Sequence, residues 1–369
     1  MSDAFASPPA GRRVPFNALV PGKDRRDIAR AIDRVIDSGW FVLGPEVDAF
    51  ESEFAAASGA RHAVGVGSGT DAITLILRAL GIGPGDEVIT PPLSAAYTAL
   101  AVLMTGARPV FADIDPVRLT IDPAAIEAAV TPRTRAILPV HLYGQAADLE
   151  AILPIAARHG LAIVEDCAQA HLATCGGFPV GVIGIAGAFS FYPTKNLGAL
   201  GDAGAIVTND EGLAARVRRL RNGGQTTRYR HEEAGINSRL DELQAAILRA
   251  RLPRLSAWTR RRRAIAAAYR AGIGSQALAV PPELDAGHAY HLFPVLAADR
   301  ETLQARLAAR GVETLVHYPV PIPRQPALAD TDPRQCPVAD RLCGEVLSLP
   351  MYPSLSDEDV AHVVAATQS

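Results

Sequence analysis

The sequence contains very little lysine: of its 36 basic residues only Lys23 and Lys195 are lysines, and the others are arginines. It also lacks an excess of either charge, since its formal net charge is -3 and its pI is about 6.3. A chain without a strongly positive field is not expected to bind nucleic acid or an anionic membrane surface. A small molecule is the expected partner.

Long apolar runs and paired cysteines are missing as well. Gly, Pro or a charged residue interrupts every apolar stretch before it reaches the length of a membrane span. The four cysteines (Cys167, Cys175, Cys336 and Cys343) show no paired C-x-x-C spacing, and the N-terminus has no apolar signal-peptide core. No histidine pair has the spacing of a helical metal site, so we expect no metal. We expect a soluble, cytoplasmic protein with reduced thiols.

The hydrophobic residues that are present, 49% of 369, are enough for a large core. Two amphipathic helical patterns, at 24–38 and 46–58, form an N-terminal arm. Short apolar runs then alternate with helical patterns: HAVGVGS, EVITPP, RPVFADI, AILPVHL, LAIVEDC, GAFSFY and AGAIVTN. Because these runs are apolar enough to be buried on both faces, they predict a mostly parallel sheet covered by helices.

The pattern changes after about residue 209, where a long helical stretch at 240–271 leads out of the sheet region. Beyond it we expect a small α+β domain with strands at 288–296 and 312–317 and helices at 300–310, 337–347 and 357–366. The predicted organisation is an N-terminal arm with helices (1–60), a large domain (61–250), and a linking helix with a small C-terminal domain (251–369).

Polar residues follow three of the predicted strands, at the edge of the sheet where ligands bind. Ser68, Gly69 and Thr70 join a strand to an apolar helix, and the free amides at such a helix start suit a phosphate. Read alone, this segment is more simply an ordinary helix cap. Asp166 ends another strand, where a buried carboxylate is costly unless a cation such as a pyridinium nitrogen meets it. A capping or salt-bridging acid explains that segment about equally well.

Lys195 follows a third strand, in the Gly-rich segment SFYPTKNLGALGDAG. Apolar neighbours disfavour its ammonium form, which makes the amine available to condense with an aldehyde. A surface-loop lysine is the alternative, and it is weakened by the scarcity of lysine elsewhere. The three strand ends together offer a phosphate cradle, a pyridinium partner and an imine-forming amine. These are the groups needed to bind and use pyridoxal 5'-phosphate (PLP).

With these motifs, the sequence resembles the DegT/DnrJ/EryC1/StrS family of sugar aminotransferases. The resemblance covers nearly the whole chain, through SGWFVLGPEVDAFE, SGTDA, GIGPGDEVITP, FADID, PVHLYGQ, VEDCAQAH, SFYPTKNLGALGDAG, NSRLDELQAA, HYPVPI and LSLPMYP. It implies PLP-dependent fold type I, like aspartate aminotransferase, with a large, mostly parallel seven-stranded sheet domain and a small α+β C-terminal domain. It also implies a homodimer.

The resemblance assigns the cofactor contacts residue by residue. Lys195 matches the lysine that forms the imine and carries the proton, and Asp166 matches the aspartate that pairs with the pyridine nitrogen. Gln169 matches the residue near the phenolic side of the ring. The phosphate-binding positions are Gly69, Thr70 and Ser190.

Further residues are expected at the substrate or at the neighbouring subunit. Asn237 resembles the asparagine that reaches the phosphate of the neighbouring subunit's cofactor, so the resemblance implies active sites shared across the dimer. Arg239 is expected to contact the substrate or the donor. Trp40 and Tyr318 are candidates for lining the sugar pocket, and packing in the core or at the dimer interface explains these large aromatics at least as well.

The sequence departs from the family at the residue that stacks on the ring. Many members have an aromatic residue in a TYIAT-like run, whereas this chain reads SAAYT and places Ala95 there, with Tyr97 two residues later. Either Tyr97 covers the ring or a smaller contact serves.

The implied reaction is transamination from an amino acid, glutamate or glutamine, to a nucleotide-linked keto-deoxysugar. A dTDP-linked 3-keto-6-deoxyhexose is favoured, and amination at C3 or C4 stays open. One rival is a PLP-binding sugar dehydratase or lyase, but such relatives have His where this chain has Lys195. The other is a regulatory, non-catalytic family member, against which the retained Lys195, Asp166, Gln169 and Ser190 argue.

Overall fold

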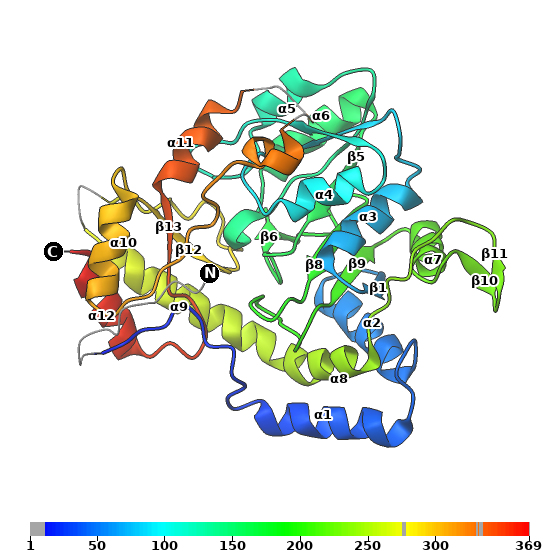
Figure 1. Cartoon of the computed structure of the whole chain (residues 1–369), viewed down its shortest axis with the longest axis horizontal. Coiled ribbons are helices and arrows are strands. Elements are labelled where there is room, and N and C mark those ends of the chain that lie inside the picture. The colour runs from blue at the N-terminus through cyan, green and yellow to red at the C-terminus, as the bar shows by residue number, and fades with distance from the viewer. Residues whose placement is uncertain (1–11, 275–277, 330, 332–334, 369) are drawn as a thin grey trace.

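The computed structural model describes residues 12–274, 278–329, 331 and 335–368, and its centre is a seven-stranded sheet (Figure 1). The strands are β1 (His62–Val66), β2 (Glu87–Thr90), β3 (Arg108–Phe111), β4 (Thr134–Ile137), β5 (Ala162–Asp166), β8 (Ala186–Ser190) and β9 (Gly204–Thr208). Their order is β1-β9-β8-β5-β4-β2-β3. Only the pairings of β9 with β1 and with β8 are antiparallel. The predicted mostly parallel sheet is confirmed, and each predicted run contributes one strand.

Helices cover both faces of the sheet because successive strand residues point to opposite sides. Ala63, Ile137 and Ile163 pack toward α2 (Pro45–Ala57), α5 (Pro123–Ala129), α6 (Leu149–His159) and α8 (Glu242–Arg251). Val64, Ala136 and Val164 pack toward α3 (Gly69–Ala79), α4 (Tyr97–Leu103) and α7 (Glu211–Leu220). The large domain is therefore a three-layer sandwich with a core on each side of the sheet.

A separate core lies beyond the sheet, at the far end of helix α9 (Leu255–Gly272), which runs in Figure 1 from α8 to the C-terminal elements. Strand β12 (Phe293–Leu296) pairs antiparallel with β13 (Val346–Leu349). Helices α10 (Arg300–Ala309) and α12 (Asp357–Thr367) pack on this core, whereas α11 (Pro337–Glu345) packs in another core with Leu142 and Tyr143. Tyr269 of α9 packs against Phe293 in the first of these two cores. Helix α9 thus carries the chain from the sheet to a small α+β unit.

The expectation of a strand at 312–317 is wrong. Val312 bridges Val14 and Leu315 bridges Ser348, so the segment is shared between two partners and forms no ladder with either. The strand expected at 288–296 is confined to β12, because the preceding residues bond to Tyr143 and Gly144 instead. The helix expected at 337–347 ends at Glu345, where β13 begins.

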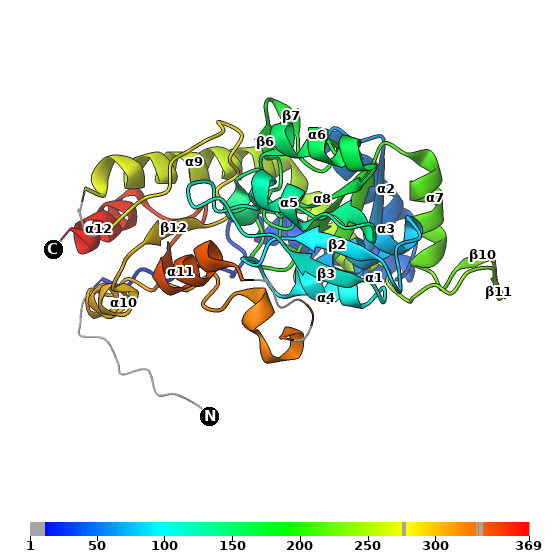
Figure 2. The ribbon, with the colours of Figure 1, turned by 90° about the horizontal axis from the view of Figure 1, so that it is seen from above.

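The remaining elements are short or peripheral. Helix α1 (Arg25–Ser38) packs on α8, and the hairpin of β10 (Gln225–Thr227) and β11 (Arg230–His231) projects from the body (Figures 1 and 2). Strands β6 (Thr174–Cys175) and β7 (Phe178–Pro179) form another small hairpin. Across the described ranges, no helix is both long and apolar enough to cross a membrane. The domain boundaries given above stay predictions, and residues 1–11 of the N-terminal arm lie outside the described residues.

Candidate active site

The three polar strand ends meet at one edge of the sheet. Asp166 ends β5 beside Ala188 of the paired strand β8, which itself ends at Ser190. Helix α3 starts at Gly69 so close to Ser190 that a Cβ on Gly69 would lie 2.8 Å from the Ser190 Cβ. Lys195 lies in the loop of residues 191–203 that joins β8 to β9, called here the Lys195 loop. Strand pairing thus assembles residues that are far apart in sequence.

The Asp166 carboxylate is held by two donors. Its Oδ2 accepts from Thr98 Oγ1 at 2.8 Å, and its Oδ1 accepts from the Ala168 amide at 3.0 Å. Thr98 is positioned in turn by Ser94, with 3.2 Å between the two hydroxyl oxygens. Asp166 is only 4% exposed. A fixed, buried carboxylate of this kind suits a cationic ligand group such as a pyridinium nitrogen.

The preceding acid, Glu165, points to the other side of the strand and is fully engaged by protein groups. It accepts three backbone amides from the segment 181–184, at 2.6, 2.9 and 2.7 Å, and lies 3.0 Å from His141 Nε2. His141 Nδ1 accepts a backbone amide, so Nε2 carries the proton and donates to Glu165. Cys167 joins these side chains in a group with ligand atoms within 4.8 Å of one another. Because His141 and Glu165 already use those atoms, we assign no metal there.

Lys195 loses its proton more readily than an ordinary lysine does. Burial lowers its pKa to about 8, and the attraction of Asp166 opposes this shift only in part. The neighbouring histidines stay neutral: burial, reinforced by the Lys195 charge, lowers the pKa of His171 to about 3, that of His317 to about 4 and that of His291 well below its usual range. Lys195 and Asp166 therefore carry the charge of this site.

The Lys195 loop is anchored to the C-terminal part of the chain. Asn196 Nδ2 donates to the Ala289 carbonyl at 3.0 Å, and its Oδ1 lies 3.1 Å from His291 Nδ1. Both side chains are buried. The backbone amide of Lys195 donates to the backbone carbonyl of Tyr192 at 2.8 Å, which closes a turn inside the loop. These bonds fix the backbone on both sides of the lysine.

Gln169 and Tyr318 lie next to each other beside Asp166. Gln169 Nε2 donates to the Tyr318 hydroxyl at 3.1 Å, while Gln169 Oε1 accepts from the amide of Tyr143 at 2.7 Å. The Tyr143 hydroxyl donates to the carbonyl of His317. Burial, followed by the Asp166 charge, raises the pKa of Tyr318 to about 12, so it stays a neutral hydroxyl. Gln169 and Tyr318 thus lie in the same site as Lys195 and Asp166.

The start of α3 has the form of a phosphate cradle. Ser68 caps the helix by accepting from the Asp71 amide at 3.1 Å, which leaves the amides of Gly69 and Thr70 outside the helix's own hydrogen bonds. A side chain at Gly69 would fill the space toward Ser190. Free amides, a hydroxyl and the helix dipole suit a phosphate dianion. Together with Lys195, the described residues therefore fit PLP.

Among the described residues, no hydrogen bond joins the other predicted residues to this group within one chain, although Ala95 and Tyr97 lie between Ser94 and Thr98, which reach Asp166. Tyr97 begins α4 with 65% of its surface exposed, and Ala95 lies just before it. Trp40 is 56% exposed, Asn237 is exposed, and Arg239 donates to Asn222 at 3.1 Å.

Sequence reasoning missed Thr98 and Asn196. Thr98 closes the TYIAT-like run and Asn196 follows the lysine directly, so both were visible in the motifs. Their partners, Asp166 and Ala289, are distant in sequence, and only the fold reveals those contacts.

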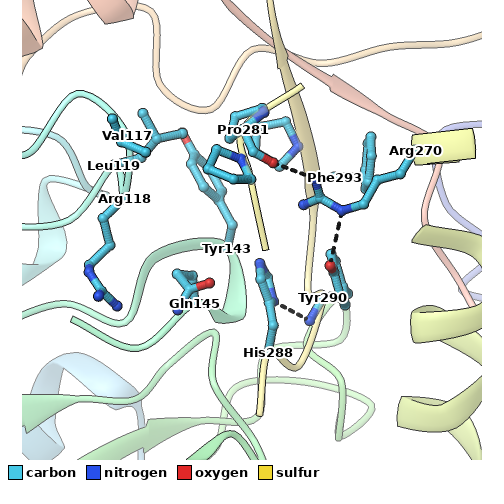
Figure 3. A pocket seen from close by; sticks show the side chains of 12 residues that line it. Val117, Arg118, Leu119, Tyr143, Gln145, Arg270, Pro281, His288, Tyr290 and Phe293 are labelled. Atoms are coloured by element: carbon cyan, nitrogen blue, oxygen red, sulfur yellow. Dashed lines mark hydrogen bonds between the residues drawn. The ribbon is translucent and has the colours of Figure 1, made fainter. Parts of the chain in front are cut away.

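A small cavity of about 20 Å³ lies near the site, behind Tyr143 (Figure 3). Arg270 crosses one side of it, donating to the Tyr290 hydroxyl at 3.3 Å and to the Pro281 carbonyl at 2.6 Å. The Tyr290 amide donates to His288 Nδ1 at 2.9 Å. This volume admits a water molecule but no substrate, so we interpret the region as closely packed protein interior and not as a binding site.

Residues 23–368 match the model of the DegT/DnrJ/EryC1/StrS aminotransferase family. The chain belongs to this family. It is 52% identical to the erythromycin biosynthesis sensory transduction protein EryC1 of Saccharopolyspora erythraea, over 94% of this chain and 95% of that protein. It is 49% identical to the dTDP-3-amino-3,4,6-trideoxy-alpha-D-glucose transaminase of Streptomyces venezuelae, over 96% of each.

Solved structures of family members share the fold. The crystal structure of S. venezuelae DesV in complex with a ketimine intermediate matches with a TM-score of 0.94 and 49% identity, covering 96% of this chain and 98% of that one. The structure of NtdA from Bacillus subtilis with bound cofactor PMP matches with a TM-score of 0.90 and 35% identity, covering 96% and 84%. The family resemblance and the fold-type-I prediction are confirmed.

Proposed function

We propose that the protein uses PLP to transfer an amino group from an amino acid to a nucleotide-linked keto sugar. The observation that carries the proposal is the meeting of Lys195, with its pKa lowered to about 8, and the fixed carboxylate of Asp166. PLP, when bound, supplies an electron sink for the carbanion formed at the substrate carbon. The structure of a family member with bound PMP supports this cofactor.

The residues of the chain divide the remaining work. Asp166 would hold the pyridinium nitrogen, and the amides of Gly69 and Thr70 with Ser190 would hold the phosphate. Lys195 would accept a proton from the substrate carbon and return it. The pKa values of the histidines around it are too low for them to hold a proton near pH 7, so they are poor bases there. Gln169 would contact the phenolic side of the ring.

The acceptor we favour is a dTDP-linked 3-keto-6-deoxyhexose, with glutamate or glutamine as donor. The name of the S. venezuelae relative, a dTDP-3-amino-sugar transaminase, supports the acceptor class. The donor rests on the family resemblance. We place the reaction in the cytoplasm, with which the four cysteines, none of them in a disulfide, are compatible.

The absorption spectrum tests the central claim. The purified protein should absorb near the visible edge through its Lys195-bound cofactor, and Lys195→Ala should abolish the band while Lys23→Ala, the matched lysine control, retains it. A wild-type protein that binds no PLP would refute the proposal. Adding glutamate or glutamine should bleach the band, and incubation with nucleotide-linked 3-keto and 4-keto sugars should then yield an amino sugar detectable by mass.

A regulatory role is the second candidate, because the relative at 52% identity is named a sensory transduction protein. The same titration separates the two functions. A band that neither donor bleaches favours regulation, whereas donor-dependent bleaching favours transamination. The dehydratase or lyase alternative is disfavoured by Lys195, as argued above.

We also propose a homodimer with shared active sites. Trp40, Asn237 and the projecting β10–β11 hairpin lie exposed outside the Lys195 site of their own chain, where a second subunit can meet them. Mixing inactive Lys195→Ala and Asn237→Ala proteins should restore activity, because each hybrid dimer contains one site with both residues intact. If mixing restores nothing after subunit exchange is verified, the site is not shared in this way.

A further inference from the structure

Arg262 of helix α9 is a buried cation whose partners are backbone carbonyls. The residue is only 3% exposed, and its Nη1 donates to the carbonyls of Tyr290, His291 and Met351 at 3.2, 3.1 and 2.7 Å. Burial lowers its pKa to about 9, so the guanidinium stays charged at neutral pH, and no carboxylate pairs with it among the described residues. Charged donors form stronger hydrogen bonds than neutral ones, above all away from water. Arg262 therefore holds these carbonyls firmly.

Tyr290, one of these partners, has a backbone conformation that needs support. Its φ is 44°, in the left-handed region, which a residue with a side chain adopts only at an energetic cost. Such conformations persist where the surroundings fix them, and they are frequent at functional sites. The Tyr290 ring stacks on that of His288, with 3.8 Å between the ring centroids (Figure 3). Because Arg262 binds the carbonyl of Tyr290 and the next carbonyl along the chain, it fixes the backbone at the strained residue.

The same segment, residues 289–291, also holds the residue that follows Lys195. The Ala289 carbonyl accepts from Asn196 Nδ2 at 3.0 Å, and His291 Nδ1 lies 3.1 Å from Asn196 Oδ1. Because Asn196 uses its nitrogen as the donor, its oxygen must accept, which places the proton of the imidazole on Nδ1. The segment that the guanidinium holds therefore holds the Lys195 loop in turn.

A purely structural role for Arg262 is the alternative, since its third bond ties α9 to a more distant part of the chain. The next residue, Arg263, offers a comparison. Its Nε donates to the His288 carbonyl at 3.0 Å, so it binds the same stretch of chain just outside the segment 289–291. Both arginines would share a role in general cohesion, whereas a role in placing the Lys195 loop belongs to Arg262 alone.

We propose that Arg262 is a positioning residue for transamination: it fixes the segment 289–291, which through Asn196 sets where the Lys195 amine lies. The role of Lys195 in this inference rests on the proposed function. An amine that takes up a proton and returns it has to come back to the same place in every cycle, and small displacements at such a position are costly. Among the described residues, no hydrogen bond joins Arg262 to Lys195 itself, so its effect travels through the segment.

A double-mutant cycle tests this connection in the PLP-loaded protein. The pH at which the Lys195-bound absorption band changes is measured for Arg262→Met, for Asn196→Ala and for the double variant. Each single change should shift this pH by about half a unit or more. The double variant should shift it no further than the larger single shift, because both changes break the same connection. Arg263→Met, the matched control, should leave it unchanged.

Three results overturn the proposal: an unshifted Arg262→Met profile, additive shifts in the double variant, or an equal shift in Arg263→Met. Arg262→Lys separates positioning from a field effect, because it keeps the charge but loses the planar set of donors. It should shift the profile in the same direction as Arg262→Met, and a fully restored profile would show that only the charge matters. Should Arg262→Met not fold, Arg262→Lys takes its place in the cycle.

Other titrating groups near Lys195 do not account for such a shift. Their pKa values lie away from the range of the lysine, at about 3 for His171, about 4 for His317, well below the usual range for His291 and at about 12 for Tyr318. The Asp166 carboxylate supplies the remaining charge that acts on Lys195, and every variant retains it.

Acetylation of the cofactor-free protein gives a measurement that does not depend on the proposed function. Lys195 and Lys23 are the only lysines in the chain, so peptide mass spectrometry after brief treatment with acetic anhydride gives the ratio of their reactivities. Arg262→Met should change this ratio severalfold and Arg263→Met should not. An unchanged ratio overturns the positioning role.

The outcome is separable from that of the proposed function. A wild-type protein without a PLP band refutes the transaminase proposal, while the acetylation ratio still tests Arg262. Donor-dependent bleaching together with an unchanged ratio refutes the positioning role and leaves the transaminase proposal standing.

Discussion

Replacing Lys195 with methionine should stabilise the cofactor-free protein at neutral pH. The folded-state pKa of about 8 lies below the ordinary lysine value of 10.5, so the folded protein binds fewer protons than the unfolded chain between these values. Its free energy of unfolding therefore rises with pH across that window. Removing the partly buried ammonium should add up to about 3 kcal/mol at pH 7, and the gain should shrink to about 1 kcal/mol near pH 9.5.

Urea unfolding of cofactor-free wild-type and Lys195→Met proteins, at one fixed protein concentration and several pH values, measures this difference. Lys23→Met is the control, because Lys23 is exposed and its replacement should leave no pH-dependent gap. Equal stability of wild type and Lys195→Met at pH 7, or a gap that does not narrow as pH rises, would refute the claim that burial controls the Lys195 amine.

Three further changes address the cofactor contacts, each measured by titrating PLP into cofactor-free protein and following the absorption band. Thr98→Val removes a hydrogen bond to Asp166 and should weaken PLP binding roughly tenfold without unfolding the protein; unchanged affinity would contradict this role. Gly69→Ala places a methyl group 2.8 Å from the Ser190 Cβ and should weaken PLP binding at least as much, while Gly344→Ala, at an exposed position with open space and no left-handed φ, is a steric control. Asn196→Ala should shift the pH at which the band changes, because the Lys195 loop loses an anchor; an unshifted profile with normal affinity would show that the anchor does not position the lysine.

The sheet was predictable because each strand carries its own apolar signal. HAVGVGS, LAIVEDC and AGAIVTN are buried on both faces and bounded by turn residues, and each forms the expected strand. The segment 312–317, VETLVH, also contains several β-branched residues, yet it forms no strand. Its residues meet Val14 on one side and Ser348 on the other. Local pattern records the tendency to extend but not whether a continuous partner is present.

The residues of the site that stand at strand ends were predictable as well. Lys195 and Asp166 stand at strand ends, and the order of parallel strands brings such ends together. The groups that orient them were not predictable, because Thr98 contacts Asp166 across 68 residues and Asn196 contacts Ala289 across 93. These contacts depend on how α4 and the C-terminal part of the chain pack against the sheet. Residue type shows the chemistry available, whereas three-dimensional packing determines which side chains orient it.

A comparison of Lys195 with Arg262 shows why a lysine, and not an arginine, suits the reacting position. Burial lowers the pKa of both side chains, to about 8 for the lysine and about 9 for the arginine. At pH 7 roughly a tenth of the lysine is free amine, several hundredfold more than at its ordinary pKa of 10.5. The arginine starts from 12.5, so similar burial leaves it almost wholly charged. Burial therefore creates a nucleophile only at the lysine, and it leaves a permanent cation at the arginine.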